Sequence, residues 1–174
     1  MRKVYSGIAW FVAGLVVVQA AAIALGFGGM MHFVDTGGVV DKALTESRTA
    51  SNFTGEIGFP IHGIVGGLVM PIAALLLVLA SWFTKVRGAT WWALGLFVLV
   101  VVQGSLGYSI KDVPYIGLVH GANALAVLAL AVVCARRPSV SARRTTVPAV
   151  VPLCWCPTGT SDRPSTTCPI AITE

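Results

Sequence analysis

Four long apolar stretches dominate the pattern of hydrophobic and polar positions along the chain. They span about 7–27, 57–83, 90–109 and 114–135, and none of them contains Asp, Glu, Lys or Arg. Each is close to, or longer than, the roughly 20 residues that a helix needs to cross the hydrocarbon core of a bilayer. The pattern therefore predicts an all-α protein with four transmembrane helices.

The polar links between these stretches indicate how the helices follow one another. The first link, about 28–56, is long and contains a candidate short amphipathic helix near Val40–Thr49, whereas the links 84–89 and 110–113 are short. Short links make successive helices antiparallel neighbours, so we expect an up-down four-helix bundle in one domain, residues 1–137. The second and fourth helices then run parallel to each other.

Composition and charge place this bundle in a membrane. The chain has 174 residues, of which 56% are hydrophobic and only 11% charged, against about 25% charged residues in soluble domains. The lipid bilayer is therefore the first predicted partner, and the protein is expected to be integral to the membrane.

The net charge of +5 reflects topology and does not indicate nucleic-acid binding. Eight of the twelve basic residues lie before the first stretch, in the link between the second and third, or after the fourth: Arg2, Lys3, Lys85, Arg87, Arg136, Arg137, Arg143 and Arg144. Cytoplasmic loops carry an excess of Lys and Arg. We therefore expect both termini and the middle link to be cytoplasmic.

The two ends of the chain carry further expectations. Residues 138–174 are rich in Pro, Ser, Thr and Arg and have no sustained apolar run, which predicts a disordered cytoplasmic tail. The abrupt change of character after Arg137 leads to the hypothesis that this tail is non-native or frame-shifted. A cleaved signal peptide is an alternative for the first stretch, although about 20 apolar residues are long for the core of such a peptide.

Two histidines inside the apolar stretches are the candidate chemistry. His62 lies five residues after Ile57 and His120 six residues after Pro114, which places both rings roughly 8–9 Å below the expected outer face. A titratable ring in hydrocarbon is costly and is usually functional. Two such rings at one depth on parallel helices predict axial ligation of a haem iron, with His62 and His120 as the metal ligands.

Small residues beside the histidines favour a flat cofactor. Positions three or four residues from a histidine share its helix face, and here several of them are Gly or Ala. Gln103 is a candidate to accept a hydrogen bond from a ligating imidazole. The predicted cofactor-binding residues are His62, His120, Gly58, Gly66, Gly117, Ala124 and Gln103. Close packing between helices is the alternative role for these small residues.

Other interpretations of the histidines stay open. In one alternative, each ring only forms a hydrogen bond between helices, with Gln19, Gln103 or Asn123 as its partner. Zinc needs four ligands, which only His32 or a loop acid such as Asp35 would complete. A proton relay is disfavoured because no carboxylate lies within the apolar stretches.

A Q-x-x-L-G motif ends the third apolar stretch, and a histidine follows in the fourth. The residues concerned are Val101-Val102-Gln103-Gly104-Ser105-Leu106-Gly107, then Pro114 and His120. This pattern resembles the third and fourth helices of one half of a haem A synthase, and Ile61-His62-Gly63 resembles the histidine of that family's second helix. The chain, over about 1–137, is also similar to short four-helix bacterial membrane proteins without assigned activity. The resemblance implies haem-ligating histidines in a protein of the bacterial cytoplasmic membrane.

Three features depart from the haem A synthase pattern. The family's catalytic carboxylate has no clean counterpart, because Glu56 lies six residues before His62. The usual histidine–arginine pair is His62-Gly63 in this chain, and the outer-loop cysteine pair is missing from the sequence. These departures leave the paired histidines in place and do not support oxidation of a haem methyl group.

The sequence thus predicts a b-type haem protein with two histidine ligands near the outer face, working in electron transfer or as an accessory subunit of a larger respiratory complex. A bis-histidine iron has no open coordination position, which favours electron transfer over an enzymatic role. One alternative is a haem A synthase-like enzyme formed by a homodimer. The other is an accessory membrane protein without haem.

Overall fold

The computed structural model describes residues 1–46 and 51–145, and its regular structure is entirely helical within those ranges. Four helical spans are long and apolar enough to cross a membrane: α1 (Arg2–Asp35), the combined span Gly58–Trp82, α5 (Ala89–Ser109) and the part Ile116–Arg137 of α6. The predicted all-α class and the four apolar spans are confirmed. Orientation in the membrane stays a prediction.

The long first link contains a short helix, as the sequence predicts. This helix, α2 (Lys42–Glu46), follows Asp41, whose Oδ1 accepts a hydrogen bond of 2.8 Å from the Leu44 amide. A side-chain acceptor at this position satisfies one of the amide groups that a helix start leaves without an intrahelical partner. Residues 47–50 of the link lie outside the described ranges.

Two helices run beyond their predicted ends. The first, α1, continues from 27 to Asp35 through Gly28 and Gly29, because the returning chain packs on it: a Cβ at Gly29 would lie 1.8 Å from the Thr54 carbonyl oxygen. The last, α6 (Ile116–Thr145), continues past 135. Extending a formed helix needs no new nucleus. Residues 138–145, which were predicted as part of the disordered tail, are accordingly helical. Residues 146–174 of that predicted tail lie outside the described residues.

The second span is not the single regular helix that the sequence predicts. It consists of α3 (Gly58–Ile64), the π-helix η1 (Val65–Val69) and α4 (Met70–Trp82). Pro71 lies in the first turn of α4 and has no amide hydrogen to donate to the preceding turn. The wider turns of η1 precede this proline, and such turns are frequent at functional sites.

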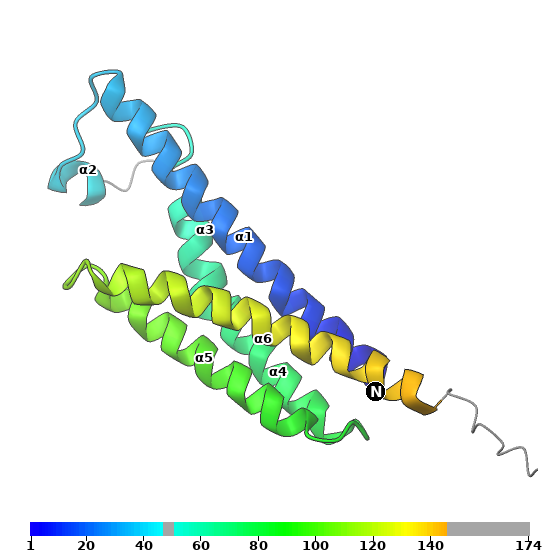
Figure 1. Cartoon of the computed structure of the whole chain (residues 1–174). Coiled ribbons are helices and arrows are strands. Elements are labelled where there is room, and N and C mark those ends of the chain that lie inside the picture. The colour runs from blue at the N-terminus through cyan, green and yellow to red at the C-terminus, as the bar shows by residue number, and fades with distance from the viewer. Residues whose placement is uncertain (47–50, 146–174) are drawn as a thin grey trace, which may run out of the picture.

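The four spans form two hairpins that share one packed end. The α1 helix packs against α3, α4 and α6, and α5 packs against α4 and α6. Figure 1 shows α1 and α6 side by side near the N-terminus and diverging toward the other end, where α1 stays with α3 and α6 stays with α5. This arrangement fits the predicted up-down order of helices, although the bundle is open at one end.

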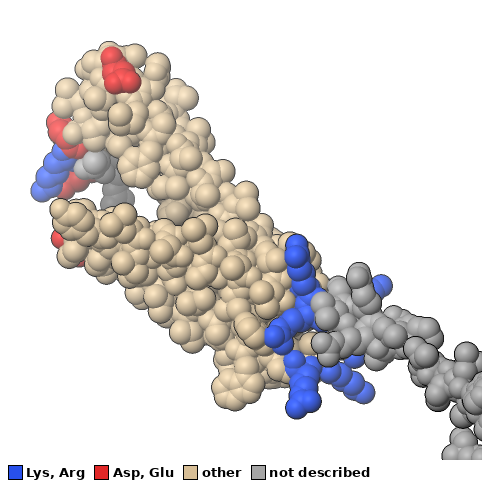
Figure 2. Space-filling view, in the orientation of Figure 1, with Lys and Arg blue, Asp and Glu red and all other residues tan. Residues whose placement is uncertain are grey.

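The two ends of the bundle differ in charge (Figure 2). We call one end the acidic end; it carries Asp35, Asp41, Glu46, Glu56 and Asp112, together with Lys42 and Lys111. The basic end carries Arg2, Lys3, Lys85, Arg87, Arg136 and Arg137. Within the described residues, no Asp or Glu lies at the basic end.

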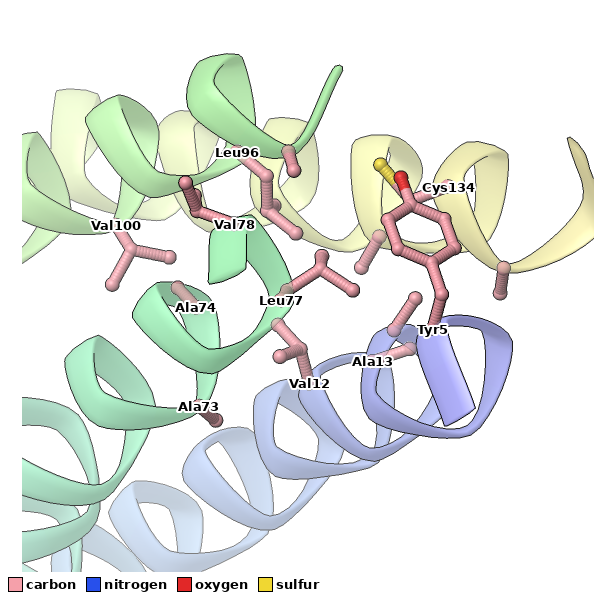
Figure 3. Close-up of a cluster of buried hydrophobic side chains, with 14 of the residues drawn as sticks. Tyr5, Val12, Ala13, Ala73, Ala74, Leu77, Val78, Leu96, Val100 and Cys134 are labelled. Carbon is pink, nitrogen blue, oxygen red and sulfur yellow. The ribbon is translucent and has the colours of Figure 1, made fainter. Parts of the chain in front are cut away.

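The apolar core lies toward the basic end, and Figure 3 shows part of it. Tyr5, Leu77 and Leu96 are fully buried there, and the Tyr5 hydroxyl donates a hydrogen bond of 3.3 Å to the Ala89 carbonyl oxygen. Ser6 likewise donates from its Oγ to the Ala135 carbonyl oxygen at 2.8 Å, which ties α1 to α6. Alanines between the larger side chains let the helices approach closely.

Between the two hairpins, the half of the bundle at the acidic end is less tightly packed. In α5 the last buried residue is Val100, and in α6 the first is Val127. Figure 2 shows a hollow between the two hairpins at this end. The packed half therefore holds the hairpins together, and the open half leaves room between them.

Large apolar side chains face outward along all four spans. Examples from the four are Phe11, Leu68, Val98 and Leu118, each more than half exposed. Soluble monomers rarely expose such continuous apolar surface. Together with the length of the spans, this surface supports a membrane-embedded protein.

Candidate functional site

The structure brings the two predicted histidines together. His62 of α3 and His120 of α6 come from different hairpins, and their ring centroids are 6.2 Å apart with the planes inclined by 56°. Both side chains are half-buried. They lie in the open half of the bundle, because both precede the first buried residues of α4 and α6.

Each histidine is oriented by a main-chain carbonyl of the neighbouring helix. His62 Nδ1 lies 3.1 Å from the Gln19 carbonyl oxygen of α1, and His120 Nδ1 lies 3.2 Å from the Gln103 carbonyl oxygen of α5. A carbonyl oxygen can only accept, so Nδ1 donates in both rings. In a neutral imidazole, Nε2 is then the unprotonated nitrogen, with a lone pair for a metal or another donor.

The two hairpins therefore repeat one arrangement. In each, a glutamine on the first helix offers its carbonyl oxygen to a histidine on the returning helix, and a glycine follows that histidine directly: Gly63 and Gly121. A Cβ at either glycine would meet nothing within 4 Å. The site thus has an approximate internal symmetry that the amino-acid sequence does not display as a repeat.

The symmetry ends at the side chains of the two glutamines. The Gln103 Nε2 lies 3.1 Å from His120 Nε2 and is the donor of that pair. Asn123 fixes this amide, because its Nδ2 donates to Gln103 Oε1 at 2.7 Å and to the Leu99 carbonyl oxygen at 3.0 Å. His120 thus has partners at both nitrogens, and both partners are groups of Gln103.

The Gln19 side chain does not contact a histidine nitrogen. It lies against η1, where a Cβ at Gly66 would be 2.3 Å from Gln19 Nε2. Its Oε1 is buried and has no hydrogen-bond partner within the described residues. A polar group left without a partner in an apolar region is costly.

The small residues predicted to flank the cofactor fall into different environments. A Cβ at Gly58 would lie 2.1 Å from the Ala22 carbonyl oxygen, so this glycine serves the close packing of α3 on α1. Gly66 accommodates Gln19, as described above. Gly117 meets nothing within 4 Å, and Ala124 is half-buried on α6.

Gly107 is a site residue that sequence reasoning did not single out, although it ends the Q-x-x-L-G motif. A Cβ at this position would lie 3.2 Å from His120 Cε1 and 3.5 Å from its Nδ1. The glycine therefore makes room for the His120 ring against α5. Its spacing of four residues from Gln103 was the available signal, because both then lie on one helix face.

Glu56 and His32 lie apart from the paired histidines. Glu56 accepts hydrogen bonds from the Asn52 amide and, at 2.9 Å, from Asn52 Nδ2. These bonds lower the pKa of the Glu56 carboxyl group. His32 is exposed near the end of α1, where its carbonyl oxygen accepts from Thr36. No group of three or more His, Cys, Asp or Glu within the described residues is placed to hold a metal ion.

Comparison with family models, curated proteins and solved structures finds no match for this chain. The fold and the apolar surface define the class: an all-helical protein whose four long apolar helices suit a membrane. The haem A synthase likeness stays an expectation from the sequence motifs.

Proposed function

We propose that this chain is a b-type haem-binding protein of the bacterial cytoplasmic membrane, with His62 and His120 as axial ligands, acting in electron transfer or as a subunit of a larger respiratory complex. The observation that carries the proposal is the 6.2 Å between the ring centroids. A nitrogen ligand lies about 2 Å from a first-row metal. Two imidazoles on opposite sides of one metal therefore have centroids about 6 Å apart.

The hydrogen bonds of the site support this use of the rings. A metal-ligating histidine typically donates its second N–H to a carbonyl or carboxylate, which fixes its tautomer. Here both Nδ1 atoms donate to glutamine carbonyl oxygens, so Nε2 carries the lone pair in each ring; at His120 that lone pair accepts a hydrogen bond from the Gln103 side chain. Figure 2 shows a hollow between the hairpins at the acidic end, and a Cβ at Gly121, directly after His120, would meet nothing within 4 Å.

The chemistry supplied by a bis-histidine haem is one-electron transfer, because its iron has no open coordination position. The residues of this chain would hold the imidazoles neutral and oriented, through the carbonyl oxygens of Gln19 and Gln103. This role requires no carboxylate in the span.

A second candidate function is an accessory membrane protein in which the histidines only join helices. The observation in its favour is the Gln103 side chain, whose Nε2 donates to His120 Nε2 at 3.1 Å. This bond occupies the lone pair that ligation needs. Haem binding therefore requires the Gln103 amide to rotate away, while its carbonyl oxygen keeps the Nδ1 bond.

An absorption spectrum tests the proposal. The full chain purified with haem should show a sharp α-band on reduction, as expected of low-spin bis-imidazole iron. His62→Ala and His120→Ala should each abolish this low-spin spectrum, because each removes one axial ligand. His32→Ala, a matched change at the exposed histidine, should leave it intact. Stoichiometric haem in the His62/His120 double variant would reject the assignment.

A further inference from the structure

The basic end of the bundle holds positive charge that no described acidic residue neutralises. None of its cations forms an ion pair with another described residue; they are Arg2, Lys3, Lys85, Arg87, Arg136 and Arg137. The ion pair Lys42–Glu46, at 3.6 Å, lies at the acidic end. Figure 2 shows the basic side chains gathered where the apolar spans end.

Arg137 differs from the other cations in being fixed against an aromatic ring. Its guanidinium carbon lies 4.1 Å from the centroid of the Trp92 ring. The side chain is half-buried, whereas the adjacent Arg136 is exposed. A Cβ at Gly88 would lie 3.9 Å from Arg137 Nη1, so the guanidinium lies beside the start of α5.

Within the described residues, this guanidinium finds no hydrogen-bond acceptor. Its Nε is buried and has no hydrogen-bond partner within the described part of the chain, and no described residue accepts from its Nη groups. Arginine presents a planar fork that matches the oxygens of a phosphate. Stacking on Trp92 holds this plane in place, so less side-chain freedom is lost when an anion binds.

We infer that Arg137 and Trp92 form a binding site for the phosphate of an anionic phospholipid, with Lys85 and Arg87 of the link before α5 adding positive charge. Two observations point to a lipid as the source of the phosphate. The site lies at the end of apolar spans, and Trp91, the neighbour of Trp92, is 79% exposed in the position of an interfacial anchor. The acyl chains would then follow the exposed apolar side chains of α5, such as Leu94 and Val98.

The test compares lipids on the full chain purified in detergent. Phosphatidylglycerol, phosphatidylcholine and inorganic phosphate are titrated separately, and bound lipid is counted by native mass spectrometry alongside the thermal unfolding midpoint. We expect phosphatidylglycerol to bind and to raise the midpoint more than phosphatidylcholine does. Arg137→Gln should weaken phosphatidylglycerol binding about tenfold, the size of one hydrogen bond to a charged group. Arg136→Gln should leave it unchanged.

A second pair of variants tests the role of the ring. Trp92→Leu should weaken phosphatidylglycerol binding because it frees the guanidinium, whereas Trp91→Leu should not. Arg137→Lys keeps the charge without the planar fork, so we expect a partial loss of phosphatidylglycerol binding. This variant replaces Arg137→Gln in the test if circular dichroism shows that Arg137→Gln does not fold. Equal losses in Arg137→Gln and Arg136→Gln would overturn the site in favour of diffuse attraction. Equal protection by inorganic phosphate would overturn the lipid assignment.

Discussion

At the residue scale, Gln19 and Gln103 make different contacts with the histidines beside them. Gln103 contacts His120 with both its carbonyl oxygen and its side-chain amide, whereas Gln19 contacts His62 with its carbonyl oxygen alone. The carbonyl bonds orient the rings and leave Nε2 as the basic nitrogen. The Gln103 amide competes for that nitrogen, so the identity of this side chain should control how readily the site accepts a metal.

Replacing Gln103 with Leu should therefore strengthen haem binding. The change removes the amide that donates to His120 Nε2 and keeps the carbonyl bond to Nδ1. One net hydrogen bond is worth about 1 kcal/mol, which corresponds to roughly fivefold in affinity. Haem titration followed by absorption spectroscopy would measure this gain. Gln19→Leu is the matched control, because the Gln19 side chain contacts no histidine nitrogen. The haem affinity of this variant should equal that of the wild type. Weaker haem binding by Gln103→Leu would show that the amide supports the bound state.

At the scale of helices, the close packing of α3 against α1 depends on one glycine. A Cβ at Gly58 would meet the Ala22 carbonyl oxygen at 2.1 Å and the Gly26 amide nitrogen at 2.7 Å, and neither backbone atom can move without the helix. Gly63, in the same helix, meets nothing within 4 Å. One helix thus carries a glycine needed for packing and another that packing does not require.

Gly58→Ala should accordingly destabilise the protein, by about 1–3 kcal/mol as in other overpacked sites. Gly63→Ala should be neutral or stabilise by up to about 1 kcal/mol, because alanine loses less backbone freedom in a helix. Thermal unfolding in detergent, monitored by helical circular dichroism, distinguishes the two. Equal midpoints for both variants would contradict the close contact between α1 and α3.

The whole molecule combines a packed half at the basic end with an open half at the acidic end. The buried core residues of α5 and α6 all lie on the basic side of the histidines. Charge follows the same axis: among the described residues, the basic end carries cations without acids, and the acidic end carries all five acids. The open half can thus hold chemistry while the packed half keeps the hairpins together.

This charge asymmetry predicts the orientation in the membrane. Loops rich in Lys and Arg stay cytoplasmic, so reporter fusions at Lys85 should be cytoplasmic and those at Glu46 extracytoplasmic. An alkaline phosphatase and a fluorescent protein, active on opposite sides, would give complementary signals at the two positions. Signals from the same side would refute four spans in an up-down order.

The sequence by itself determined the elements and the candidate residues. Four uncharged apolar stretches specify four helices, because only a helix satisfies its own backbone within hydrocarbon. The expected equal depth of His62 and His120 follows from counting residues along two parallel helices, and Gln103 was among the polar residues proposed as hydrogen-bond partners of the histidines. These are properties that local periodicity encodes.

Only the tertiary structure decided how these residues meet. The 6.2 Å between the histidine rings, the carbonyl bonds from Gln19 and Gln103, and the packing role of Gly58 depend on contacts between helices distant in the chain. The π-helical turns of η1, two residues before Pro71, were likewise not predicted from the sequence. Local periodicity shows which side of a helix is apolar but not which partner that side contacts, and that choice sets the geometry of the site.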